Sequence, residues 1–132
     1  MQYDREWFNS LEKPKNQPPA WVFAPVWFFL YSLMVVSLIL VILSPFRILS
    51  LFAYLFFALQ LIVNFQWAPA FFKEHNLRKA FIISVLLTLL VFITMIIFYQ
   101  VSKIAGVMFL PYFLWCCFAN YLMFEILELN EW

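Results

Sequence analysis

Residues 80–102 read AFIISVLLTLLVFITMIIFYQVS, a run without a single charged side chain. A helix needs about 20 residues, at ~1.5 Å each, to cross the ~30 Å hydrocarbon core of a bilayer, and a charge at its centre is costly. This run is therefore long enough and apolar enough to cross a membrane. The intervals 16–46, 48–72 and 104–124 are also free of charged residues and also long enough.

These intervals predict an all-α fold, a polytopic membrane bundle of four transmembrane helices near residues 19–43, 47–72, 77–101 and 104–129. The connections between them are short, so consecutive helices are expected to pack as antiparallel neighbours. Residues 1–18 are read as a polar N-terminal segment and 19–132 as the helical bundle. The Pro18-Pro19 pair suits the start of the first helix, because proline is tolerated in a first turn.

The composition excludes several other classes of protein. Of the 132 residues, 67% are hydrophobic, 23% are aromatic and 11% are charged, whereas a soluble domain carries about a quarter charged residues. The net charge of +1 offers no basic surface for nucleic acid, and a single glycine leaves no glycine-rich phosphate loop. Cys116 and Cys117 are adjacent in an apolar run without nearby histidine or carboxylate, so no metal site is expected.

The distribution of Lys and Arg predicts the orientation of this multi-pass protein in the membrane. With four spans, both termini and the connection at 73–79 lie on the same side. Because basic residues concentrate on the cytoplasmic side, both termini are expected to face the cytoplasm. That side carries Arg5, Lys13, Lys15, Lys73, Arg78 and Lys79, and the other carries Arg47 and Lys103.

A polar face on the second span is the first candidate functional feature. Gln60, Asn64 and Trp67 recur at helical spacing and therefore share one side of the helix. Amides at this depth cannot face lipid without leaving donors unpaired, so this side must face the bundle. Two interpretations stay open, namely hydrogen bonds between helices and contacts to a ligand.

Aromatic residues on the first and last spans extend this candidate site. Trp115 lies about 17 Å into its span, too deep for the interfacial belt in which membrane tryptophans usually occur. An interior walled by aromatic rings, with few polar groups and no charge, suits a flat, largely apolar ligand; core packing is the alternative. The candidate ligand-binding residues are Trp27, Tyr31, Gln60, Asn64, Trp67, Tyr112, Trp115, Ala119 and Leu122. The third span is read as mainly a packing and lipid-facing helix.

Three groups of motifs follow one another along the chain. They are Lys13-Pro14, Pro18-Pro19 and Pro25-Val26-Trp27 with Leu30-Tyr31; Gln60, Asn64, Trp67 and Pro69; and Leu110-Pro111-Tyr112, Trp115, Phe118-Ala119 and Leu122. In order and spacing these motifs resemble the TspO/MBR family, the tryptophan-rich sensory proteins that include the mitochondrial translocator protein (peripheral benzodiazepine receptor).

The resemblance implies a membrane protein that binds porphyrin, haem or similar tetrapyrroles inside the bundle and acts as a sensor or translocator. The family also includes bacterial members with proposed light-dependent breakdown of porphyrin. The resemblance therefore leaves open whether this chain is an enzyme. Trp27 and Trp115 match the pocket tryptophans of the family, and Asn64 and Trp67 match its polar and aromatic wall. The partners implied are membrane lipid and a flat hydrophobic small molecule, with porphyrin or haem as ligand rather than resident cofactor.

The chain also departs from the family pattern. The family fold has five helices, and this sequence begins where the first inter-helix loop would be, so the first helix is expected to be absent. Two alternatives stay open. Either the true start lies upstream, or this is a four-helix variant whose pocket is open on one side or closed by a second copy in a homodimer. Phe124 and Glu128 replace the tyrosine and arginine of the sterol signature, so cholesterol specificity is not expected.

Other functions are weighed against this interpretation. A proton-coupled exporter needs a carboxylate within the membrane, yet no Asp or Glu occurs between Glu12 and Glu74 or between Glu74 and Glu125. The single histidine, His75, falls in a predicted turn, which disfavours acid–base catalysis. The remaining alternative is a structural or regulatory membrane subunit without a small-molecule ligand.

Overall fold

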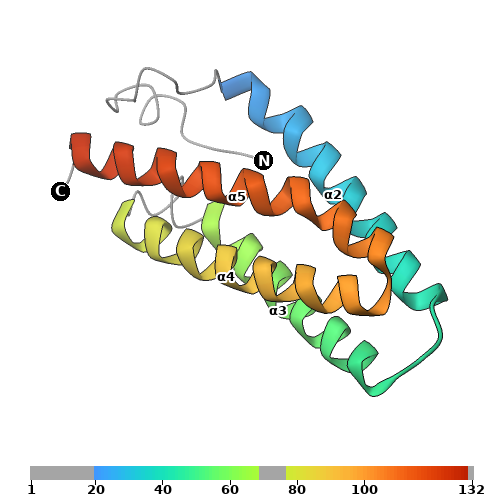
Figure 1. Ribbon diagram of the computed structural model, residues 1–132. Coiled ribbons are helices and arrows are strands. Elements are labelled where there is room, and N and C mark those ends of the chain that lie inside the picture. Colours follow the sequence, from blue (N-terminus) through green and yellow to red (C-terminus); the bar gives the residue numbers. More distant parts are fainter. Residues whose placement is uncertain (1–19, 69–76, 131–132) are drawn as a thin grey trace.

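The computed structural model describes residues 20–68 and 77–130, and this part of the chain forms a bundle of long helices (Figure 1). The helices are α2 (Ala20–Leu43), α3 (Ile48–Ala68), α4 (Leu77–Val101) and α5 (Lys103–Asn130). All four are long and apolar enough to cross a membrane. The predicted all-α membrane bundle is confirmed, and the ends of the helices fall within one residue of the predicted ends, except that residues 69–72 of the second span lie outside the described residues.

The helices do not pack strictly in chain order. Helix α4 packs against both α3 and α5, whereas α2 packs mainly against α5 and makes few close backbone contacts with α3. The prediction that consecutive helices are neighbours is therefore wrong for α2 and α3. Their connection, residues 44–47, permits this arrangement, because its non-helical backbone can span up to about 14 Å and joins two separated helix ends (Figure 1).

The turn between α4 and α5 is tight and depends on the only glycine of the chain. The Ser102 N–H donates to the Phe98 carbonyl at 2.7 Å, and the Gly106 N–H donates to the Ser102 carbonyl at 3.1 Å. A Cβ added at Gly106 would lie 2.5 Å from both Cα and Cβ of Tyr99. The backbone of α5 can approach α4 this closely only because position 106 has no side chain.

Arg47 links the connection after α2 to the far end of α4. Its Nη2 donates to the Gln100 carbonyl at 2.6 Å. The last carbonyls of a helix have no partner within the helix, and a cation near them is also favoured by the helix dipole. This bond therefore satisfies one of the last carbonyls of α4 and links the start of α3 to it.

The core between the helices is largely aromatic. The rings of Phe98 and Phe109 meet edge to face with centroids 5.0 Å apart, Phe57 stacks on Phe98 at 5.9 Å, and Tyr112 contacts Phe109 at 5.6 Å. Edge-to-face and stacked pairs add about 0.5–1.5 kcal/mol each beyond the area they bury. These rings join α3, α4 and α5 into one packed unit.

We predict that Gly106→Ala destabilises the bundle by about 1–3 kcal/mol, because the new methyl group is forced into a packed contact. In an unconstrained helix the same change would stabilise the helix by up to about 1 kcal/mol. A loss of stability therefore indicates the close approach of α5 to α4. Thermal unfolding of purified protein in detergent measures it, with Cys117→Ala on the exposed side of α5 as the control. A midpoint that rises for Gly106→Ala would contradict the close approach.

Candidate ligand-binding site

The amides of α3 point into the bundle, as their spacing predicts. Gln60 is 0% exposed and Asn64 is 7% exposed. Their neighbours Leu59, Ile62 and Phe65 lie on the outer side of the helix. Helix α3 therefore presents an apolar side to lipid and a polar side to α2 and α5, as required where no water can satisfy an amide.

A chain of hydrogen bonds joins these amides to tyrosines on the neighbouring helices. The Tyr31 hydroxyl donates to Oδ1 of Asn64, whose Nδ2 donates to the Tyr112 hydroxyl at 2.8 Å. The Tyr112 hydroxyl in turn donates to Oε1 of Gln60 at 2.7 Å. Nε2 of Gln60 is 3.8 Å from Sδ of Met34, a weak acceptor. We call these five residues the tyrosine–amide chain; it connects α2, α3 and α5.

An aromatic wall lies beside this chain. Trp27 contacts Tyr31 with ring centroids 5.7 Å apart and meets Tyr112 edge to face at 6.3 Å. Tyr31 also lies 6.3 Å from the ring of Phe65. Tyr112 is fully buried, whereas Trp27 and Tyr31 are only partly buried. The indole of Trp27 therefore packs against both tyrosine rings and keeps part of its own surface outside the packed core.

Five of the nine predicted site residues contact one another through hydrogen bonds or ring contacts, and the other four are placed by their burial and packing. Trp115 is partly buried, packs on the same core cluster as Trp27 and lies 5.5 Å from the ring of Phe118. Trp67 packs instead on a second cluster that includes Leu77 and Met123. The other two lie further along α5, where Leu122 is buried and Ala119 is partly buried. The five in contact are Trp27, Tyr31, Gln60, Asn64 and Tyr112.

These contacts define how such a site could hold a ligand. The tyrosine hydroxyls and amide oxygens already bond to one another, so they serve to join helices and to fix the rings of Tyr31 and Tyr112. The partly buried rings of Trp27, Tyr31 and Trp115 provide flat apolar surface. Within the described residues, no three His, Cys, Asp or Glu side chains come together as metal ligands. The arrangement suits stacking against a flat molecule.

A second polar cluster, between α4 and α5, was not predicted from the sequence. The Ser84 hydroxyl donates to Oδ1 of Asn120, and Nδ2 of Asn120 donates to Oγ1 of Thr88 at 2.7 Å. Thr88 also donates to the Ser84 carbonyl at 2.8 Å. The signal in the sequence is Asn120 within an apolar span, opposite a Ser and a Thr at helical spacing. Helix α4 thus contributes polar contacts as well as apolar packing.

Comparison with known proteins agrees with this architecture. The TspO/MBR family matches residues 1–129 of the chain. "Protein CrtK" of Rhodobacter capsulatus is 39% identical over 94% of this chain and 78% of its own length. A "Tryptophan-rich protein TspO" of Chlorobaculum tepidum is 35% identical over 94% of this chain and 79% of its own length. The "Translocator protein" of Ovis aries is 32% identical over 95% of this chain and 75% of its own length.

The helices and the comparisons together define the class of protein. Four apolar helices with polar groups turned inward make this an integral membrane protein of the helical-bundle type. The chain belongs to the TspO/MBR family, as the motifs around Trp27, Asn64 and Trp115 indicate.

We predict that Tyr112→Phe destabilises the bundle by about 1–3 kcal/mol. It removes the donor to Gln60 and the acceptor for Asn64, and it leaves both amides buried without these partners. Tyr121→Phe is the matched control, because Tyr121 lies on the same helix with 45% of its surface exposed, and it should change stability by less than about 0.5 kcal/mol. Equal thermal stability of the two variants would exclude a structural role for the tyrosine–amide chain.

Proposed function

We propose that the protein binds a tetrapyrrole, such as a porphyrin or haem, or a similar flat apolar molecule, against the aromatic wall, and acts as a sensor or translocator. The observation that carries this proposal is the position of Trp27. Its ring contacts Tyr31 and Tyr112 yet is only partly buried. A large π surface held rigidly at the edge of an apolar core is suited to stack on a planar ligand.

The hydrogen-bonded core supports the same proposal through rigidity. Tyr31 is fixed by its bond to Asn64, and Tyr112 is fixed by two bonds to α3. A surface that is already ordered loses little conformational freedom when it binds. The names of relatives point in the same direction, since one is called "Tryptophan-rich sensory protein" and others "Translocator protein".

We predict that Trp27→Phe weakens binding of protoporphyrin IX roughly fivefold, because the smaller ring loses part of the stacking surface. Titration of the purified protein with protoporphyrin, followed by the shift of its Soret absorbance, measures the dissociation constant without relying on tryptophan emission. Trp115→Phe should also weaken binding if both tryptophans contact the ligand.

Phe28→Leu is the control for the Trp27 variant. Phe28 is the next residue on α2 and is 77% exposed on its outer side, so losing this ring should leave porphyrin affinity unchanged. Wild-type affinity in both tryptophan variants would place the ligand elsewhere. No saturable binding by the wild type would favour the alternative function, a structural or regulatory membrane subunit without a small-molecule ligand.

We also propose that both termini face the cytoplasm, because the Lys and Arg residues concentrate on their side. A green fluorescent protein fused after Trp132 should then fluoresce in bacterial cells, and alkaline phosphatase fused at the same point should be inactive. Phosphatase inserted after Phe46, in the connection between α2 and α3, should be active. The reverse pattern would invert the orientation.

A further inference from the structure

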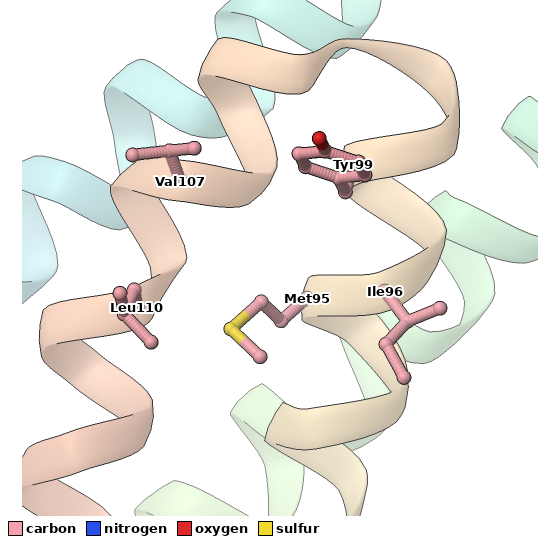
Figure 2. A pocket seen from close by; sticks show the side chains of 5 residues that line it. All are labelled: Met95, Ile96, Tyr99, Val107 and Leu110. Atoms are coloured by element: carbon pink, nitrogen blue, oxygen red, sulfur yellow. The ribbon is translucent and has the colours of Figure 1, made fainter.

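An apolar groove lies on the outer surface between α4 and α5, away from the tyrosine–amide chain. Its volume is about 230 Å³. Figure 2 shows its five lining residues, three from α4 and two from α5. Val107 is 58% exposed, and Ile96, Tyr99 and Leu110 are also exposed, so the groove opens toward the surrounding membrane. The lining residues are Met95, Ile96, Tyr99, Val107 and Leu110.

A lysine lies at the end of this groove nearest the α4–α5 turn. Lys103 begins α5 and is exposed, and Val107 and Leu110 follow it at intervals of four and three residues. These three residues therefore share one side of the helix. At ~1.5 Å per residue, the groove extends about 10 Å along α5 from Lys103, toward the middle of the membrane.

The same end of the bundle is positively charged. Arg47 is exposed, and its guanidinium bonds to the carbonyl of Gln100, three residues before Lys103. Among the side chains that the structure describes, the carboxylates are Glu125 and Glu128, near the opposite end of α5. The groove is thus lined by apolar side chains and one tyrosine, and Lys103 begins α5 at the end of the groove near the turn.

We propose that this groove binds an anionic phospholipid, with one acyl chain between α4 and α5 and the phosphate beside Lys103. The occupant is inferred from Lys103, a cation at one end of an otherwise apolar groove, because a Lys near the membrane surface attracts an anionic headgroup. Tyr99 lines the part of the groove near the turn, at the level where aromatic rings meet the headgroup region. This lipid site is separate from the aromatic wall and does not depend on the proposed function.

Native mass spectrometry of the full chain, released from detergent micelles, tests the proposal. The probes are dioleoyl phosphatidylglycerol and dioleoyl phosphatidylcholine at equal concentration. Wild-type protein should retain the anionic lipid preferentially. Lys103→Gln should lower that preference roughly fivefold, and Leu110→Trp, which fills the groove, should lower retention of the lipid itself. Val107→Trp provides a second groove-filling change at another exposed position.

Two matched variants separate this site from general lipid binding. Arg78→Gln removes an exposed cation at the start of α4, and Ile82→Trp enlarges an exposed side chain far from the groove. Both should leave retention of phosphatidylglycerol unchanged. Circular dichroism verifies that each variant keeps its helix content.

Four results would overturn the proposal. Equal retention of the two lipids would remove the headgroup preference, and an equal loss in Arg78→Gln and Lys103→Gln would make that preference non-specific. Unchanged retention in both tryptophan variants would place the lipid outside the groove. Competition by glycerophosphoglycerol, which has no acyl chains, should be weak; strong competition would indicate an anion site without the groove.

Discussion

The rest of the bundle depends on one constraint, which is that the bilayer supplies no water to satisfy a polar group. Gln60 and Asn64 on α3 therefore need partners from other helices, and Tyr31 and Tyr112 provide them. The hydroxyl of Tyr112 both accepts and donates, so the loss of this one oxygen leaves two amides without these partners. The positions of α2, α3 and α5 follow from satisfying these groups together.

Much of the fold could be predicted from the sequence because charged residues mark the ends of each span. The inward direction of Gln60 and Asn64 could also be predicted, since an amide has no stable alternative in lipid. The neighbours of α2 could not be predicted, because four residues, 44–47, can connect helix ends that touch or helix ends that lie apart. That choice is made by side-chain packing across the whole bundle.

In the candidate site, the inward direction of residues such as Tyr112 and Gln60 could be predicted, but their bonding could be predicted only in part. Helical spacing places Tyr112 and Gln60 on inward sides, yet it cannot tell which tyrosine bonds to which amide. The pairing depends on how far each helix is rotated and shifted against the next. The Ser84–Asn120–Thr88 cluster was missed for the same reason, because Ser and Thr are common in apolar helices and only a partner across the interface gives them a role.

The close approach at Gly106 has a mechanical consequence. Since α4 and α5 meet backbone to backbone beside a one-residue turn, any side chain at position 106 would collide with the backbone of Tyr99, so this contact holds the two helices as a close-packed pair. Helix α2, by contrast, is tied to α3 mainly by side-chain bonds from Tyr31 and Met34. Helix α2, which carries Trp27, is joined to the close-packed α4–α5 pair by packing on α5 and to α3 by these side-chain bonds.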